Sequence, residues 1–469
     1  MDLRFPKQFI SVHKIATTMS NFIEWTFVNT FNRLAQTGRD KLTGGLPLGM
    51  IVRDERITKT PFYLPTTLRT QHMAILGKTG TGKTSFIRSL IQHDIDSGRG
   101  LAAFDLHGDI IPAVLRYLAE KHPEFAERVV VIDPTNPAWA VGMNPLEVKD
   151  EYARFREVAG ATRGLADKWN FHGARTEELL RNSLFVLSAN GLTLLEVAIL
   201  LVNEEYRKNL LKRVSNQEVR EYFELRFDPL SESMKATMRE PVLNKLTDFT
   251  ADPHFRYLIG QRRSTVGFDD AMARGLILLF YLPKGQCGDH TLTLGSLFLT
   301  KLTAAMFRRQ RHNLFTIYAD EMQNLASADT DFETLFSEAR KFGVGIVTAN
   351  QFQAQLPQTL RSAIQAIGTR VFFQCSPEDS AQVAQEIDGG RAVAERLRNL
   401  PQRYAIVRSS SFRPCEIVTR TITNSTTSTT IILETSNRIY ARRKSEIDAD
   451  ILARRPKREN LKEVIDGWD

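Results

Sequence analysis

Short runs of apolar residues, each bounded by turn-forming residues, recur along the chain. They lie at Met73–Leu76, Leu101–Asp105, Val129–Ile132, 275–282, 314–320, 343–349 and 368–374. Runs of this length without polar alternation are typical of strands that are buried on both faces of a sheet. Segments of helix-compatible pattern separate them, as strand, loop and helix alternate. The pattern predicts an α/β fold with a mostly parallel central sheet.

The segment 150–258 has a different pattern. Charged and apolar residues mix there at helical spacing, for example at Leu179, Leu180, Leu184 and Leu187. This spacing places the apolar side chains on one face of each helix. We therefore expect an all-α domain inserted into the α/β core.

The flanking segments complete a division into domains. Residues 44–70 read as short strands and turns in a small β entry module. The segments 403–408 and 415–423 are typical of paired strands, and the Thr- and Ser-rich 421–430 of a linker or an exposed hairpin edge. The expected domains are an N-terminal helical docking segment (1–43), the β module (44–70), the α/β core (71–149 and 259–433), the all-α insertion (150–258), and a C-terminal helix over 434–453 with its tail to 469.

The first 43 residues contain a fairly apolar stretch, 15–31. Glu24 and several Thr and Asn residues interrupt it, so it is too polar to span a bilayer. We expect no integral membrane segment. The stretch is either a docking or oligomerisation helix or a helix lying on a membrane surface.

The composition excludes few classes of protein. The 469-residue chain has a formal net charge of +8 and a pI near 9.3, which permits a polyanionic partner without requiring one. The three cysteines, Cys287, Cys375 and Cys415, lack CxxC spacing, which argues for a reducing compartment and against a zinc site.

Residues 77–84 carry the strongest chemical signal. They read Gly-Lys-Thr-Gly-Thr-Gly-Lys-Thr, a complete GxxxxGK[ST] loop between a predicted strand and a predicted helix. Glycines let successive backbone N–H groups face a phosphate. We assign ATP and Mg²⁺ as cofactors, with Lys83 on the β- and γ-phosphates and Thr84 on the metal. The predicted nucleotide-binding residues are Gly77, Lys78, Thr79, Gly80, Thr81, Gly82, Lys83, Thr84 and Ser85.

A second signal is the Asp320-Glu321 pair, which ends an apolar run. In P-loop ATPases the first carboxylate holds the Mg²⁺ shell, and the second residue can polarise the attacking water. Downstream, Gln351 at a strand tip is a candidate γ-phosphate sensor. Arg340, shortly before that strand, is either a catalytic arginine that reaches the next subunit's nucleotide or a solvated helix end.

Together these motifs resemble the FtsK/HerA superfamily of RecA-like P-loop motors, and within it the TraG/TraD-like coupling ATPases of conjugative and type IV secretion systems. The resemblance spans about residues 72–408. It includes the segments 72–77, 104–109, 131–134, 144–146, 241–246, 318–321 and 349–351. It implies a DNA-translocating homohexamer driven by ATP hydrolysis, an inserted all-α domain in each subunit, and an arginine finger at Arg340.

Two departures from the family qualify this resemblance. Coupling proteins usually begin with transmembrane helices, and Leu106 stands where the family often has proline. Within 105–109, Asp105 is assigned to the nucleotide site. Asp105, His107 and Asp109 could also suggest a metal site, but a loop beside the P-loop is better suited to position water or to couple nucleotide state to DNA.

The function that follows is ATP-driven translocation of DNA without sequence preference, since no sequence-reading motif is visible. The expected location is the cytoplasm, peripheral to the inner membrane through secretion or DNA-processing partner proteins. The alternative is a nucleotide-regulated assembly ATPase that docks partner proteins. A GTPase is disfavoured because the NKxD-like segment 244–248 has its acid one residue late, and an ABC-type ATPase because no LSGGQ-like segment occurs.

Overall fold

The computed structural model describes residues 45–455 except 149, 170–172, 311–312 and 326–331. The predicted N-terminal docking helix and the end of the C-terminal tail lie outside these residues. No helix in the described part of the chain is long and apolar enough to cross a membrane. All three cysteines are free.

Within the described residues, eleven strands form one sheet in the order β2-β1-β12-β11-β10-β3-β9-β8-β4-β7-β5. Neighbours from β10 to β5 pair in parallel, and those from β2 to β10 pair antiparallel. The strands are β1 (Leu46–Arg53), β2 (Arg56–Leu64), β3 (Met73–Leu76), β4 (Leu101–Asp105), β5 (Val129–Ile132), β7 (Ile277–Tyr281), β8 (Phe315–Asp320), β9 (Val344–Asn350), β10 (Thr369–Phe372), β11 (Tyr404–Ser409) and β12 (Phe412–Val418). The predicted fold class is confirmed.

Helices cover both faces of the sheet, and each face has its own apolar core. One face packs against α2 (Lys83–Asp96), α3 (Ile111–Lys121) and α18 (Thr430–Tyr440). The other packs against α11 (Phe268–Arg274), α13 (His290–Met306), α14 (Phe332–Lys341) and α15 (Gln358–Gln365). A smaller cluster joins α16 (Pro377–Glu386) and α17 (Gly390–Arg398) to β10 and β11. The parallel strands are therefore buried on both sides, as their continuous apolar runs require.

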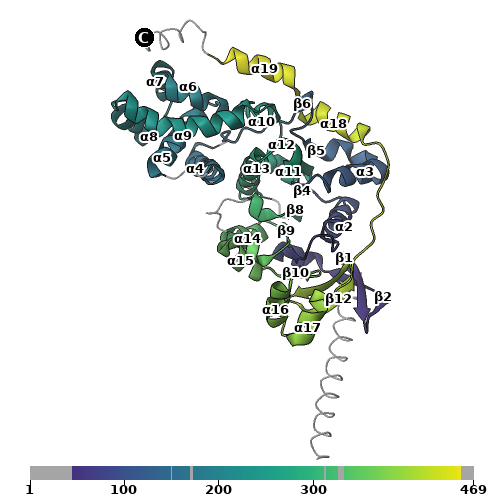
Figure 1. Ribbon diagram of the computed structural model, residues 1–469. Coiled ribbons are helices and arrows are strands. Elements are labelled where there is room, and N and C mark those ends of the chain that lie inside the picture. Colours follow the sequence, from purple (N-terminus) through teal and green to yellow (C-terminus); the bar gives the residue numbers. More distant parts are fainter. Residues whose placement is uncertain (1–44, 149, 170–172, 311–312, 326–331, 456–469) are drawn as a thin grey trace, which may run out of the picture.

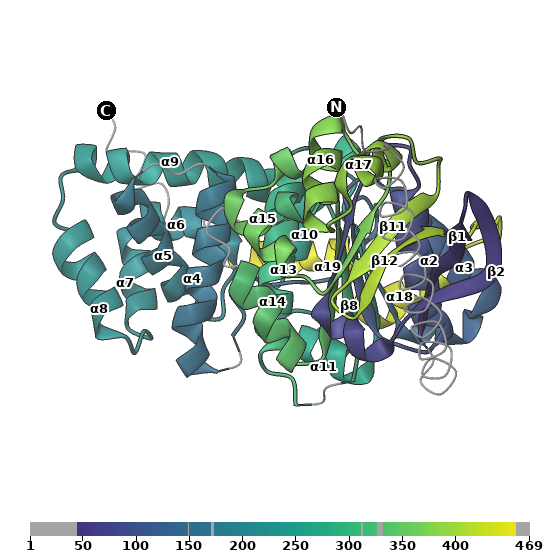
Figure 2. The same ribbon diagram turned by 90° about the horizontal axis from the view of Figure 1, so that it is seen from below.

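Among the described residues between β6 (Trp139–Ala140) and β7, all regular elements are helical. The α-helices there are α4 (Glu151–Lys168), α5 (Ala174–Ala189), α6 (Val197–Val202), α7 (Glu204–Leu211), α8 (Gln217–Glu221), α9 (Glu232–Ala251), α10 (Pro253–Ile259) and α11. Figures 1 and 2 show α4 to α9 gathered at one end of the molecule, away from β1 and β2. The helical character of this segment is confirmed, and its boundaries as a domain stay a prediction.

Two expectations about the flanks need correction. The segment 44–70 is no separate module, because β1 pairs with β12 and so extends the central sheet. The single C-terminal helix is in fact two, α18 and α19 (Lys444–Ala453). The chain leaves the helix at Arg442–Arg443 (β13) to pair with β6, a partner distant in the sequence. Residues 419–429 form an extended connection between β12 and α18, as expected for a linker.

Candidate active site

The loop 77–82 joins β3 to α2 in a conformation that requires glycine. Gly82 precedes α2 with φ of 112°, a backbone region that side chains rarely allow. A Cβ on Gly77 would lie 2.6 Å from the Cβ of Phe373. Inside the loop, the Thr81 hydroxyl donates to the carbonyl of Lys78 (2.8 Å). The loop therefore leads directly into the N-terminal turn of a helix, where free N–H groups favour an anion.

Lys83 begins α2 and folds back over this loop. Its ammonium donates to the carbonyls of Gly77 (2.5 Å) and Lys78 (2.8 Å). Burial lowers the pKa of Lys83, and the carboxylates of Asp320 and Glu321 act in the opposite direction. The structure thus holds a cation over the phosphate-binding loop, close to two acids.

The sheet brings Asp320 to this loop although the two are far apart in the sequence. Asp320 ends β8, and β9 alone separates β8 from β3. The carboxyl ends of parallel strands share one edge of the sheet, where ligands of such folds bind. Burial, and then the neighbouring Glu321 carboxylate, raise the pKa of Asp320 to about 6.

The residues present fit a magnesium ion. The Asp320 side chain is half-buried, and no described residue donates a hydrogen bond to its carboxylate. Thr84 offers a hydroxyl from the first turn of α2. One carboxylate and one hydroxyl, completed by phosphate oxygens and water, form the oxygen ligand set that Mg²⁺ prefers.

Glu321 stands in a strained position just after β8. Its φ of 53° places a non-glycine residue in the left-handed region, a feature that clusters at functional sites. One carboxylate oxygen accepts from the Asn324 side-chain amide (2.9 Å) and lies 3.5 Å from Nε2 of His107. The other accepts from Nε2 of Gln351 (3.0 Å).

Gln351 connects this carboxylate to the phosphate-binding loop. While its amide nitrogen donates to Glu321, its amide oxygen accepts from the hydroxyl of Thr79 (3.0 Å). Thr79, Gln351 and Glu321 therefore form a continuous line of hydrogen bonds from the loop to the end of β8. A change in the loop can reach the Glu321 carboxylate through these contacts.

Asp105 has a different place from the one expected. Its carboxylate is 2% exposed and accepts backbone N–H groups of Gly108 (2.7 Å), Asp109 (3.3 Å), Ile110 (2.9 Å) and Ile111 (2.8 Å). Both oxygens are occupied in shaping the turn before α3, which argues against Asp105 as a nucleotide ligand. It positions the loop that carries His107.

A metal site in this loop finds no support. Among the described residues, no group of three or more His, Cys, Asp or Glu side chains could hold a metal ion. His107 instead faces Glu321.

Arg340 lies apart from these residues. It occupies the last turn of α14, which leads into the start of β9, whereas Gln351 follows the end of β9. At roughly 3.3 Å per residue, the seven residues of β9 separate these ends by about 20 Å. The Arg340 side chain is exposed and has no hydrogen bond or ion pair to any described residue. It does not join the site of its own subunit.

The remaining predicted residues lie where the loop needs them. Lys78 donates its backbone N–H to the carbonyl of Gln374 (2.9 Å), which fixes the loop to the strand edge beyond β10. Gly80 has φ of 79°, and its backbone has room for close approach. Ser85 follows Thr84 in the first turn of α2 and is half-buried.

Sequence reasoning missed the segment that supports the loop from the other side. Gln402 donates its side-chain amide to the carbonyl of Gly80 (3.0 Å). Arg403, with φ of 72°, donates its backbone N–H to the carbonyl of Thr81 (2.8 Å). No spacing in the sequence signals this contact, because it depends on where β11 enters the sheet.

Comparisons with known proteins find matches to part of the sequence and to the fold. Residues 46–253 match the family described as the central domain of the helicase HerA. The plasmid coupling protein TrwB, solved with a non-hydrolysable GTP analogue, is similar in structure, with a TM-score of 0.58, 14% identity, and coverage of 82% of this chain and 99% of TrwB. The structure of TrwB with ADP and Mg²⁺ has a TM-score of 0.58 and 15% identity, and the match covers 81% of this chain and 96% of TrwB. VirB4 of Thermoanaerobacter pseudethanolicus has a TM-score of 0.55 and 13% identity, and the match covers 82% of this chain and 98% of VirB4. A comparison with curated proteins finds no match.

Proposed function

We propose that this chain is a P-loop ATPase of the FtsK/HerA type, which hydrolyses ATP to move DNA through a homohexameric ring. The match of residues 46–253 to the central domain of the helicase HerA and the fold shared with the coupling protein TrwB support this proposal. DNA would be held through its phosphates without sequence preference. The protein would work in the cytoplasm and meet the inner membrane through partner proteins of a secretion or DNA-processing complex.

The hydrogen-bonded line from Thr79 through Gln351 to Glu321 is the observation that carries this proposal. A site that only held a nucleotide would need the loop and Lys83. The line adds a connection between the phosphate-binding loop and an acid suited to activate water. Such a connection is what hydrolysis, as distinct from binding, requires.

The roles of the side chains follow from their positions. Lys83 exchanges its loop carbonyls for phosphate oxygens. Thr84 and Asp320 would hold Mg²⁺, which would supply positive charge to neutralise the phosphates. Glu321 accepts a hydrogen bond from the attacking water and polarises it. Gln351 keeps the Glu321 carboxylate turned toward the phosphate and senses the γ-phosphate through Thr79.

ATP turnover with and without DNA tests the proposal. We expect DNA to stimulate turnover, Lys83→Ala to abolish it, and Glu321→Gln to lower it by on the order of 10² or more while nucleotide still binds. Glu333→Gln removes an exposed charge on α14 and serves as the matched control. Wild-type turnover in Lys83→Ala would refute the assignment of the loop.

A second candidate function is a nucleotide-regulated assembly ATPase that docks partner proteins. The exposed aromatic side chains of Tyr152 (96% exposed) and Phe155 (60% exposed), both on α4, favour it, because aromatic residues are enriched at protein interfaces. DNA separates the two functions. If ATP is turned over at the same slow rate with and without DNA, the assembly function is the better account.

A further inference from the structure

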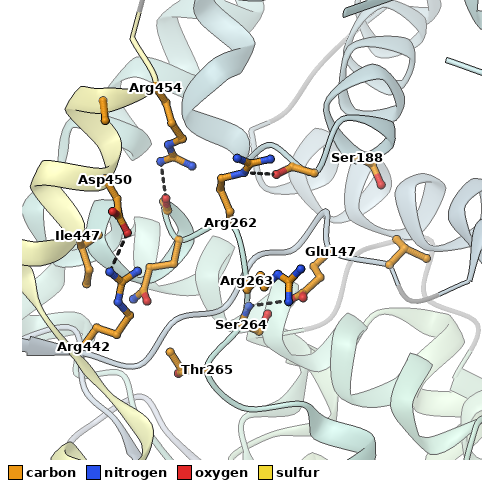
Figure 3. A pocket seen from close by; sticks show the side chains of 15 residues that line it. Glu147, Ser188, Arg262, Arg263, Ser264, Thr265, Arg442, Ile447, Asp450 and Arg454 are labelled. Atoms are coloured by element: carbon orange, nitrogen blue, oxygen red, sulfur yellow. Dashed lines mark hydrogen bonds and ion pairs between the residues drawn. The ribbon is translucent and has the colours of Figure 1, made fainter. Parts of the chain in front are cut away.

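A cavity of about 750 Å³ lies far along the chain from the phosphate-binding loop, between the linker that follows α10 and the C-terminal helix α19. Figure 3 shows α19 on one side of it, with the linker residues Arg262 to Thr265 facing across. Ser188, at the end of α5, closes a third side. The volume falls within the range of roughly 300 to 1,000 Å³ that is usual for small-molecule sites.

Four arginines and two carboxylates line this cavity, so its wall has an excess of positive charge. Asp450 pairs with Arg442 (2.7 Å). Glu147 accepts the backbone N–H of Ser264 (2.7 Å). Glu147 keeps its charge, but neither acid forms an ion pair with Arg262, Arg263 or Arg454.

Arg262 and Arg454 are held by backbone carbonyls. Nε of Arg262 donates to the carbonyl of Gly191 (2.8 Å), and Nη2 of Arg454 donates to that of Gly260 (2.7 Å). A carbonyl orients a guanidinium and leaves its charge in place. Both guanidinium groups are thus fixed in direction at the cavity, and Nε of Arg454 also lies 3.6 Å from a carboxylate oxygen of Glu196.

Arg454 lies in an unfavourable environment for a positive charge. The Arg454 side chain is 12% exposed, and its Nη1 has no hydrogen-bond partner among the described residues. Burial lowers its pKa, and Arg262 lowers it further, although Glu196 acts in the opposite direction. The adjacent Arg263 is exposed and has no ion pair to any described residue. Like charges brought together in this way are stabilised by an anion.

We propose that this cavity binds a phosphate-bearing ligand of about nucleotide size, held by Arg262, Arg263 and Arg454. Guanidinium groups match phosphate oxygens in geometry and form charge-assisted pairs with them. The phosphate comes either from a free nucleotide or from a DNA strand. The site is independent of the ATPase site and uses none of its residues.

The cavity lies where a bound ligand would contact two separate parts of the chain. Arg262 and Arg263 belong to the linker through which the helical segment α4–α10 returns to the core, and Arg454 belongs to the segment just after α19. A bound phosphate bridges these parts of the chain. It therefore fixes the helical segment relative to the C-terminal helix.

The test uses the full chain with Lys83→Ala, which disables the phosphate-binding loop. Inorganic tripolyphosphate binding is measured by calorimetry, and binding of a fluorescent 30-nucleotide single strand by anisotropy over a salt series. We expect Arg262→Ala/Arg263→Ala to weaken tripolyphosphate binding about 10- to 100-fold, because each charge-assisted bond lost is of substantial strength. The matched control Arg391→Ala/Arg413→Ala removes the same charge from exposed positions.

The two probes identify the source of the phosphate. Loss confined to tripolyphosphate indicates a free nucleotide. A parallel loss of strand binding, with a salt slope lower by about two, indicates DNA. The proposal is overturned if neither probe binds the Lys83→Ala chain, or if both double variants lose binding equally. Should the double variant melt early, the exposed Arg263→Glu change replaces it. Failure of ATP turnover in the wild-type chain bears on the proposed function alone.

Discussion

The Gln351 side chain is the single link between the phosphate-binding loop and the Glu321 carboxylate in the described structure. Replacing it by alanine removes both hydrogen bonds and leaves Lys83 and Thr84 untouched. We predict that Gln351→Ala lowers ATP turnover by about 10- to 100-fold, because a misplaced catalytic group has effects of that order. Nucleotide affinity, measured by titration with a fluorescent ATP analogue, changes less than about threefold, because the phosphate contacts remain.

Gln355→Ala is the matched control for this change. Gln355 lies on the same segment, and its side chain is exposed and outside the line of hydrogen bonds. Equal losses in the two variants would mean that the segment as a whole, and not the Gln351 amide, supports turnover.

His72 is a buried histidine whose two ring nitrogens are both used. Nδ1 accepts the backbone N–H of Ile346 (3.1 Å), so Nε2 carries the proton and donates to the carbonyl of Phe336 (2.6 Å). A second proton on the ring would face the Ile346 N–H group. Burial lowers the pKa of His72 to about 4, against the Phe336 carbonyl, which raises it, and with a further lowering from Arg340.

The pH dependence of stability follows from this neutral ring. The unfolded chain protonates His72 near pH 6.5 and the folded chain near pH 4, so the unfolded state binds more protons between these values. The stabilisation is complete above about pH 6.5 and lost as pH falls toward 4, by about 3 kcal/mol. Urea unfolding should show this loss, and His72→Gln should flatten the slope in that range.

His122 provides a control of opposite sign. Burial lowers its pKa, but hydrogen bonds from its ring to Glu124 and Asp96 outweigh this and raise it. Its contribution is therefore present at low pH and lost as pH rises. If His122→Gln and His72→Gln changed the pH slope in the same direction, the account of His72 would be wrong.

Some side chains of the site could be predicted from the sequence, and others could not. Lys83 and Thr84 are fixed by a spacing that phosphate chemistry imposes, and Asp320 by its place at the end of an apolar run. Asn324 and Gln402 take part through contacts that only the folded chain creates. The sequence could not show that Asp105 shapes a turn, because a buried acid after a strand can either contact a ligand or accept the backbone N–H groups of the turn.

At the scale of elements, the strands that lie wholly in the core were the most predictable. The bounds of β3, β4 and β5 match the apolar runs, because these strands are buried on both faces and turns bound them closely. The place of β1 in the sheet was not predictable, since it depends on pairing with β12 near the other end of the chain. The same holds for the break between α18 and α19, which a distant partner strand imposes.

The turn before α3 is held by one buried carboxylate. Asp105 satisfies four backbone N–H groups, so Asp105→Ala leaves them without their acceptor at a buried site. We predict a loss of about 2 to 4 kcal/mol in the free energy of unfolding, measured in urea. The exposed Asp109→Ala, four residues on, should change it by less than about 0.5 kcal/mol. Equal effects would show that the turn does not depend on the Asp105 carboxylate.

At the scale of the whole molecule, the proposed role of Arg340 requires that subunits meet, and the alternative is a solvated helix end. Within one subunit β9 separates it from the phosphate-binding loop. An exposed arginine free of ion pairs to described residues is suited to reach a neighbour's nucleotide. In the proposed ring, each ATP would then contact Lys83 of one subunit and the arginine of the next, and such an arginine is worth on the order of 10³ in rate.

Mixing inactive subunits tests this arrangement. In Arg340→Ala the loop is intact, and in Lys83→Ala the arginine is intact, so a mixed ring restores complete sites wherever the two meet in the right order. If sites act independently, an equal mixture should recover roughly a quarter of wild-type turnover, as random placement in a closed ring gives. Lys83→Ala mixed with Glu321→Gln is the control. Because Lys83 and Glu321 belong to the site of one subunit, this control mixture should recover no turnover, and equal recovery in both mixtures would contradict the assignment of Arg340.

Coordination between sites could suppress this recovery, and a second mixture resolves that case. Wild-type subunits are titrated with Arg340→Ala subunits. A coordinated ring that uses the arginine across its interfaces loses turnover more steeply than the wild-type fraction falls, because one missing arginine stops several sites. An arginine acting inside its own subunit gives no recovery in the first experiment and a loss in simple proportion in the second. That pair of results would remove Arg340 from the interface.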